Sequence, residues 1–216
     1  MKLRASELSG AFCMPDKPTA VVFDIGRVLF DWDLRFLFEK LIFDPVQLDW
    51  FLTHVINEEW HFQSDQGRSV AEIVAEKIAE FPDHRDLIEA YPVRFNETLP
   101  HAIPGTHELA HRLAGRGVPL FGLTNFSAEF WAGFRPVQPI FELFADVVVS
   151  GEERCAKPNP GIYAIAEQRF GLAPAQLFFT DDNPANVAAA NARGWQAHVF
   201  TGATSLEAEL IASNLL

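Results

Sequence analysis

Apolar runs alternate with helical patterns along most of this chain. The runs are short and continuous, which is typical of strands buried on both faces rather than of half-exposed strands. They are Ala20–Phe30, Val118–Asn125, Ala145–Ser150, Gln176–Thr180 and Gln196–Phe200. Because strands joined by helices are parallel and their crossovers are right-handed, the pattern predicts an α/β fold, a doubly wound parallel sheet covered by helices on both faces.

The helices between these strands carry their own start and stop signals. Asn159-Pro160 and Asn183-Pro184 each combine an N-cap residue with proline at the first helical position. We expect the first of these helices to end at Phe170 and the second at Arg193-Gly194, where glycine suits a C-terminal cap. Another helix follows Ile103-Pro104-Gly105, and a last one begins near Ser205.

Residues 34–100 have a different character, because helical spacing recurs there without an intervening strand. One helix is expected from Leu34, one from Pro45, and one from Ser69, whose S-x-x-E pattern reads as a capping box. A fourth runs from Asp83 to Leu99. The shift predicts two parts: an α/β core of residues 1–33 and 101–216, with residues 1–18 as a loose leader, and an inserted helical cap of residues 34–100.

Within the insert, the stretch from Trp60 to Arg68 mixes aromatic and polar side chains. We interpret it as a loop, which could face a substrate or pack between cap helices. The two segments that join the insert to the core, 31–33 and 100–104, are expected to act as hinges that let the cap close and exclude water.

Composition and net charge exclude some classes of binding partner and indicate where the protein is located. The chain of 216 residues has a net charge of −12, which argues against binding to nucleic acid or to an anionic membrane. No apolar run reaches transmembrane length, and residues 1–18 lack the apolar core of a signal peptide. The two cysteines, Cys13 and Cys155, form no disulfide framework. A cytoplasmic protein is expected.

Polar residues of useful types follow the predicted strands. The first strand delivers Asp24, the second ends at Thr124-Asn125, and the fourth ends at Asp181-Asp182, while Lys157 precedes a helix start after the third. Each could serve a turn or a cap. Because the carboxyl ends of parallel strands meet at one edge of the sheet, their common placement instead indicates one functional site.

Four short motifs carry a family resemblance. They are FDIGRVLFDWD (residues 23–33), LTN (123–125), KPNP (157–160) and FTDDN (179–183). Together they resemble the four motifs of the haloacid dehalogenase superfamily, and the helical insert lies where many members carry a cap. The superfamily consists mostly of magnesium-dependent phosphatases, with a minority of dehalogenases. The first motif is closest to that of bacterial phosphatases, some of which act on sugar phosphates.

The resemblance implies roles for these residues. Asp24 would be the nucleophile that forms an aspartyl phosphate, and Asp24, the Gly26 carbonyl and Asp182 would bind Mg²⁺. The Thr124 hydroxyl and the Asn125 amide would hold the transferring oxygens. The remaining residues support them: Lys157 would bind both nucleophile and phosphoryl group, Asp181 would fix the lysine or a metal-bound water, and Arg27 would contribute to substrate binding. The implied substrate is a small phosphorylated molecule, and the oligomeric state is left open.

One position departs from the family. The usual general acid, an aspartate two residues after the nucleophile, is replaced by Gly26. Three functions remain open: a phosphatase that is slow or uses a good leaving group, a 2-haloacid dehalogenase, whose halide needs no proton, or a weak enzyme that binds a phosphorylated ligand. Dehalogenases lack the adjacent aspartates, so the phosphatase is favoured. If another residue supplies the proton, Asp31, Asp33 and His61 are the first candidates.

A second motif competes with this assignment. His107-Glu108-Leu109-Ala110-His111 fits H-E-x-x-H, the zinc-protease pattern. No third ligand is evident by spacing, and Leu109 and Leu113 should turn the helix so that its histidines face solvent. We therefore expect no zinc site there.

Overall fold

The computed structural model describes residues 17–216 and is built around a parallel sheet of five strands. Their order across the sheet is β5-β4-β1-β6-β7. The bounds are Ala20–Phe23 for β1, Leu120–Thr124 for β4, Phe144–Val149 for β5, Leu177–Asp181 for β6 and Gln196–Val199 for β7. The predicted doubly wound α/β fold is confirmed, with all five strands close to their expected places.

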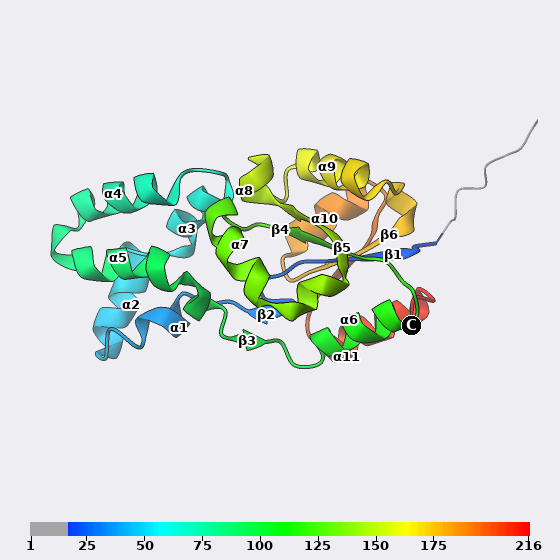
Figure 1. The fold of residues 1–216 in the computed structure, drawn as a ribbon, viewed down its shortest axis with the longest axis horizontal. Coiled ribbons are helices and arrows are strands. Elements are labelled where there is room, and N and C mark those ends of the chain that lie inside the picture. The colour runs from blue at the N-terminus through cyan, green and yellow to red at the C-terminus, as the bar shows by residue number, and fades with distance from the viewer. Residues whose placement is uncertain (1–16) are drawn as a thin grey trace, which may run out of the picture.

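Alternation along the central strand explains how both faces are covered. Val21 and Phe23 point to one face and join the larger hydrophobic core, whereas Ala20 and Val22 point to the other and join a smaller one. Helices α6 (Thr106–Gly115) and α11 (Ala203–Ala212) cover the first face. Helices α9 (Pro160–Phe170) and α10 (Pro184–Ala192) cover the second (Figure 1).

Two shorter helices and three 3₁₀ turns complete the core. Helix α7 (Ala128–Phe134) packs against the larger core, and α8 (Ser150–Glu153) follows β5 directly. The 3₁₀ turns lie at Arg135–Val137, Pro139–Leu143 and Pro174–Gln176.

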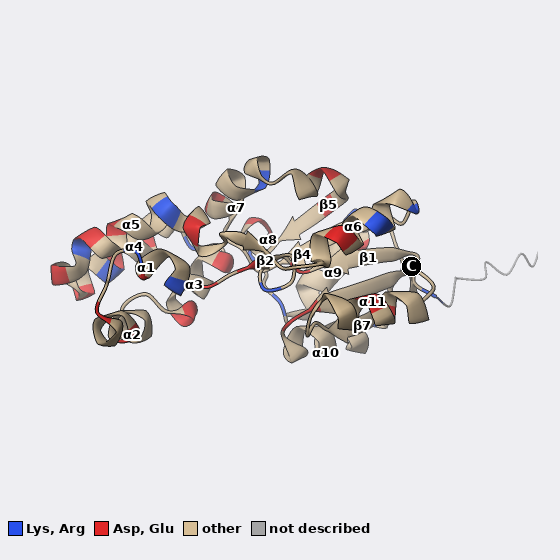
Figure 2. Ribbon diagram, turned by 90° about the horizontal axis from the view of Figure 1, so that it is seen from below, with Lys and Arg blue, Asp and Glu red and all other residues tan. Residues whose placement is uncertain are grey.

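Between β2 and β3, residues 34–100 contain only helices and turns. The helices are α1 (Arg35–Phe38), α2 (Pro45–His54), α3 (Glu58–Asp65), α4 (Val70–Glu80) and α5 (Arg85–Arg94), with 3₁₀ turns at Pro82–His84 and Phe95–Thr98. Figures 1 and 2 both show this cap beyond one end of the sheet, and Figure 2 shows that its helices carry charges of both signs.

The chain enters and leaves the cap along one small ribbon. Strands β2 (Phe30–Asp31) and β3 (His101–Ala102) pair antiparallel, so that Phe30 lies opposite Ala102 and Asp31 opposite His101. The two predicted hinge segments therefore lie side by side. Hinge motion itself stays a prediction.

Two local expectations were wrong. The stretch interpreted as a loop contains helix α3, whose N-terminus is capped by the Asn57 side chain and followed by Glu58 and Glu59. That Asn-Glu-Glu sequence was the available helix signal. The expected capping box also does not form, because Ser69 makes no side-chain cap; the Val70 amide donates instead to Glu129 Oε1 on α7, at 2.9 Å.

Candidate active site

A buried lysine lies at the centre of the sheet's carboxyl edge. Lys157 Nζ is 2.9 Å from Asp24 Oδ1 and 2.7 Å from Asp181 Oδ2, and it donates to the Leu123 carbonyl at 2.8 Å. The side chain of Lys157 is only 1% exposed. Residues from three parts of the sequence thus meet in one ion-pair network, as the strand ends predicted.

The two aspartates are fixed by backbone turns at the ends of β1 and β6. The Asp24 amide donates to the Thr180 carbonyl at 3.0 Å, and Asp24 Oδ1 accepts from the Ile25 amide at 2.7 Å. Asp181 Oδ1 accepts from the Asn183 amide at 2.8 Å, and both carboxylate oxygens accept from Asn186 Nδ2. Both carboxylate oxygens of Asp181 are thus hydrogen-bonded, and the side chain is held in position to pair with Lys157.

Asn125 holds the backbone that carries the lysine. Its Nδ2 donates to the Lys157 carbonyl at 3.0 Å, and its Oδ1 accepts from the Lys157 amide at 2.8 Å. This reciprocal pair joins the end of β4 to the loop before α9. The side chain of Asn125 therefore positions Lys157, a role that the sequence did not predict.

The charges at this edge do not balance. Carboxylate oxygens of Asp24, Asp181 and Asp182 all lie within 4.8 Å of one another. Burial, followed by the nearby Asp181 and Asp182, raises the pKa of Asp24 to about 8, despite the opposing effect of Lys157. Burial opposes the charge of Lys157, but Asp181 and Asp24 outweigh it and raise the pKa of the lysine. The three carboxylates exceed the single ammonium group in charge and offer oxygen ligands that fit a hard divalent cation.

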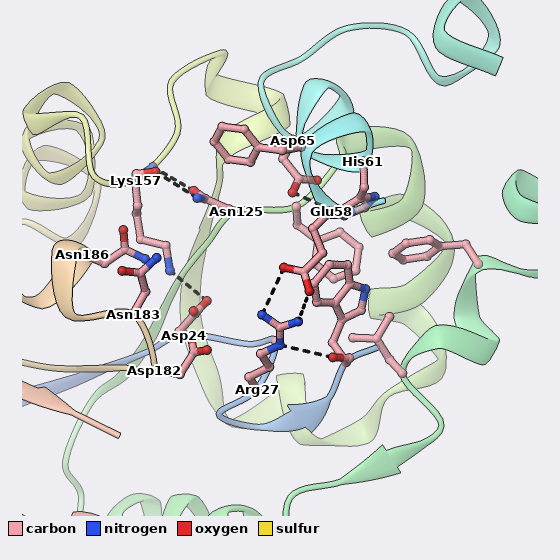
Figure 3. Close-up of a pocket in the computed structure, with 16 residues that line it drawn as sticks. Asp24, Arg27, Glu58, His61, Asp65, Asn125, Lys157, Asp182, Asn183 and Asn186 are labelled. Carbon is pink, nitrogen blue, oxygen red and sulfur yellow. Dashed lines mark hydrogen bonds and ion pairs between the residues drawn. The ribbon is translucent and has the colours of Figure 1, made fainter. Parts of the chain in front are cut away.

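A cavity of about 170 Å³ opens above this cluster. Its core side includes Asp24, Gly26, Lys157 and Asp182, and its cap side is formed largely by α3 (Figure 3). In the close-up, Glu58, His61 and Asp65 lie across the cavity from Asp24 and Lys157. The cavity is therefore shared between core and cap.

Arg27 connects the two sides. Its guanidinium forms two hydrogen bonds with Glu58 on α3, at 2.5 and 3.3 Å, and lies 4.8 Å from the centre of the Trp32 ring. Arg27 has a left-handed backbone with φ of 59°, whereas Gly26 is not among the positive-φ glycines of the described residues. The tight turn after β1 thus involves Arg27, and an added Cβ at Gly26 would lie 3.7 Å from Trp32 Cβ, an ordinary contact.

A second buried polar group belongs to the cap. His61 Nδ1 is hydrogen-bonded to the Tyr91 hydroxyl, and His61 Nε2 is 3.4 Å from Asp65 Oδ2. All three side chains are buried. Burial lowers the pKa of His61 to about 3, so the imidazole is neutral. Asp65 and Tyr91 were not anticipated, since no motif marks them.

Some candidates lie away from the cavity. Thr124 ends β4, but its side chain is buried outside the cavity lining, with Oγ1 3.5 Å from the Asn125 carbonyl. Asp31 lies in β2, and Asp33 is exposed and accepts from the Arg35 amide at 2.8 Å. Of the three candidate proton donors, His61 alone lines the cavity.

The H-E-x-x-H segment forms the first part of α6. His111 is exposed as expected, but the prediction was wrong for His107, which is half-buried, packs on Phe30 and lies 3.1 Å from the Leu29 carbonyl. Among the described residues, the aspartate cluster is the one group that could hold a metal ion. The expectation that this segment forms no zinc site stays a prediction.

Comparison with known proteins identifies the family. Residues 19–194 match the family model of haloacid dehalogenase-like hydrolases. The chain belongs to this family. It is 25% identical to the sesquiterpene phosphatase astK of Aspergillus oryzae over 81% of its own length and 86% of that protein. It is also 27% identical to the phosphoglycolate phosphatase of Escherichia coli K12, over 51% of the chain and 44% of that enzyme.

Solved structures of this hydrolase family share the fold. The HAD family enzyme bt-2542 of Bacteroides thetaiotaomicron superposes with a TM-score of 0.66 at 23% identity, covering 86% of this chain and 95% of that one. The same enzyme has been solved in complex with magnesium and inorganic phosphate. At this identity, the likeness supports the doubly wound α/β fold alone.

Proposed function

We propose that this hydrolase is a Mg²⁺-dependent phosphatase of small phosphorylated molecules. The observation that carries the proposal is the cluster of Asp24, Asp181 and Asp182 around the buried Lys157. A phosphate monoester dianion repels a carboxylate nucleophile, so its attack requires concentrated positive charge. A bound Mg²⁺, held by Asp24, the Gly26 carbonyl and Asp182, would supply that charge and orient the phosphoryl group.

In the proposed reaction Asp24 attacks phosphorus and forms an aspartyl phosphate, which water then hydrolyses. Lys157 holds the Asp24 carboxylate in place and offers its ammonium to the phosphoryl oxygens. Asp181 keeps the lysine charged and aimed. The Asn125 side chain maintains the loop from which the lysine reaches the site.

The charges around the cavity favour a neutral, hydroxyl-rich leaving group. Asp24, Glu58 and Asp182 bring carboxylates to its lining, and Asp65 adds a buried carboxyl group. The two basic side chains in its lining, Arg27 and Lys157, are already paired with carboxylates. A second negative charge on the substrate would be repelled, whereas sugar hydroxyls would find acceptors beside Trp32. We therefore favour a sugar phosphate over a phosphorylated carboxylic acid.

The relatives support phosphoryl chemistry, because the curated proteins named above are phosphatases. A 2-haloacid dehalogenase is the second candidate, since it shares the fold and needs no acid at position 26. The aspartate cluster favours the phosphatase. A protein that binds a phosphorylated ligand with little turnover is the third. Across residues 17–216 no helix combines the length and apolar character needed to cross a bilayer, and a cytoplasmic location stays a prediction.

A substrate panel tests the proposal. It contains p-nitrophenyl phosphate, sugar phosphates, phosphoglycolate and 2-chloropropionate, each assayed with Mg²⁺ and with excess chelator. We expect Mg²⁺-dependent phosphate release, fastest from a sugar phosphate among the metabolites. Chloride release that continues in chelator would identify a dehalogenase. Binding of phosphate without turnover of any ester would identify the third function.

A further inference from the structure

The structure leaves one chemical need unmet on the core side of the cavity. When the bond from phosphorus to the leaving oxygen breaks, an alkoxide would form unless a proton reaches it. Gly26 lines the cavity but has no side chain to donate one, and Lys157 is occupied by three acceptors. Asp31 and Asp33 do not line the cavity. A proton donor has to come from the cap side.

We propose that Asp65 on α3 is the general acid and base of this site, positioned by His61. The inference rests on the proposed phosphatase function and adds the catalytic group that the core lacks. Asp65 lines the cavity with its carboxyl facing the core side, across from Asp24 (Figure 3).

The surroundings of Asp65 keep its carboxyl protonated. The residue is 4% exposed, and Oδ1 has no hydrogen-bond partner. Leaving an ionised oxygen without a partner in such a place is far more costly than leaving a neutral carboxyl there. Burial raises the pKa of Asp65 well above its usual value, although the Ser127 amide opposes it; Asp24 adds a smaller rise, and Lys157 has a still smaller lowering effect. A raised pKa lets the carboxyl keep its proton to higher pH, which suits a proton donor.

Contacts with His61 and with the core hold Asp65 in place. The Tyr91 hydroxyl has His61 Nδ1 as its partner, so donation from the phenol leaves the imidazole proton on Nε2, facing Asp65 Oδ2 at 3.4 Å. On the other side, Ser150 Oγ donates to the Asp65 carbonyl at 2.6 Å and accepts from the Phe126 amide at 3.0 Å. The core therefore holds this end of α3 directly.

The proposed steps balance. Asp24 attacks phosphorus, the bond to the leaving oxygen breaks, and that oxygen takes the proton of Asp65 and departs as an alcohol. The Asp65 carboxylate then takes a proton from the water that attacks the aspartyl phosphate. Hydrogen phosphate leaves, Asp24 regains its carboxylate, and Asp65 is again protonated.

Glu58 is the other cap carboxylate in the cavity, and its surroundings differ. It is 62% exposed at its side chain and paired with Arg27. The Arg27 guanidinium already occupies this carboxylate, which is open to solvent and can accept a hydrogen bond from a substrate. The contrast singles out Asp65.

The leaving group supplies the decisive test. An alkoxide needs a proton, whereas p-nitrophenolate does not. We expect Asp65→Asn to lower kcat/KM for a sugar or alkyl phosphate by about 10²–10⁴-fold, the usual contribution of general acid catalysis. For p-nitrophenyl phosphate we expect a change below about tenfold. A merely structural role, or a role in binding, would not distinguish leaving groups in this way.

The second half of the reaction gives an independent readout. With p-nitrophenyl phosphate, Asp65→Asn should release p-nitrophenol in a burst of about one equivalent per enzyme and then slow down, because the aspartyl phosphate lacks its base. Trapped phosphoenzyme can be detected by mass spectrometry. His61→Gln should slow the alkyl substrate more than the aryl one, in the same direction as Asp65→Asn but by less.

Asp49→Asn is the matched control, since Asp49 is an exposed cap carboxylate paired with Arg35. This substitution should leave kcat/KM unchanged for both substrates. Retained p-nitrophenol release shows that Asp65→Asn is folded. Equal losses on both substrates, or wild-type rates for both, would overturn the role of Asp65 while leaving the phosphatase intact. A wild-type protein that hydrolyses no phosphate ester would instead overturn the proposed function.

Discussion

The two sides of the cavity are built in different ways. On the core side, Asp24, Lys157 and Asp181 come from three distant stretches of sequence and are held by strand ends and by one another. On the cap side, Glu58, His61 and Asp65 all come from the eight residues of α3. The core side concentrates charge around a single lysine, whereas the buried pair on the cap side is kept neutral.

This difference separates two tasks. Charge that acts on phosphorus must be fixed within fractions of an ångström, and the converging strand ends of a parallel sheet provide that. Groups that act on the leaving oxygen must match a substrate, so one helix that can vary as a unit is a suitable carrier. The following predictions test this contrast between the two sides, beginning with the largest expected effect.

Asp24→Asn removes the proposed nucleophile from the core side. We expect turnover of every phosphate ester to fall by on the order of 10⁴-fold or more, because no other group can take its place. The loss should be the same for aryl and sugar substrates, unlike that caused by Asp65→Asn. Steady-state kinetics measure it, with Asp33→Asn, an exposed carboxylate outside the cavity, as the control.

Asp182→Ala tests whether the core cluster binds the metal. Residues that merely orient metal ligands contribute about 10–100-fold to affinity, so the loss of a ligand should weaken Mg²⁺ and Mn²⁺ binding by at least that much. Calorimetric titration of the metal measures this directly. Asp65→Ala should leave metal affinity nearly unchanged. An equal loss in both variants would contradict the division between the two sides.

Gly26→Asp restores an acid to the core side. The space beside Gly26 accepts a Cβ, and the backbone there is not left-handed. In the Asp65→Asn background we expect the second substitution to raise kcat/KM for an alkyl phosphate by about 10- to 100-fold, part of what a general acid supplies. Gly26→Ala in the same background should give no recovery.

The stability of the metal-free protein should depend on pH. The pKa of Asp24 rises from 3.8 to about 8 on folding, so the folded state binds this proton more tightly. That stabilisation is complete below about pH 4 and is lost as the pH rises to about 8. The lowered pKa of His61 acts oppositely, but only below about pH 6.5.

Between pH 6.5 and 8 the free energy of unfolding should therefore fall as the pH rises. Urea denaturation in the presence of chelator measures this slope. Saturating Mg²⁺, which favours the ionised carboxylate, should make the slope shallower, and so should Asp24→Asn; burial also raises the pKa of Asp65 and of Asp182, which contribute with the same sign. A rising slope in the metal-free wild type would contradict the assigned environment of Asp24.

The smallest effect concerns the seam between cap and core. Glu129 caps α4 from the core, whereas Ser69 makes no side-chain cap. Glu129→Ala should cost about 0.5–1 kcal/mol of unfolding free energy, typical of a lost N-cap. Ser69→Ala should cost less than about 0.5 kcal/mol. Thermal denaturation of both variants measures the difference. A larger loss of stability for Ser69→Ala than for Glu129→Ala would support the capping box instead.

The positions of the site residues could be predicted from the sequence on the core side but not on the cap side. Buried strands can be recognised from apolar runs in the sequence, and the carboxyl ends of parallel strands meet at one edge of the sheet. The sequence therefore predicted that Asp24, Lys157 and Asp181 lie close together. The direction of a side chain after a strand is less accessible from sequence, and the role expected of the Thr124 hydroxyl stays a prediction. No comparable rule places Asp65, because its burial depends on how α3 packs against α8 and the end of β4.

The pairing of Phe30 with Ala102 has a consequence for how this protein can change. The chain leaves the core and returns to it at one point. The length of the inserted segment therefore does not affect the pairing of the strands in the sheet. Shortening or lengthening such a loop alters its closure entropy only logarithmically. New helices could be exchanged at this junction, and new substrates acquired, while the strand order and the lysine at its edge stay as they are.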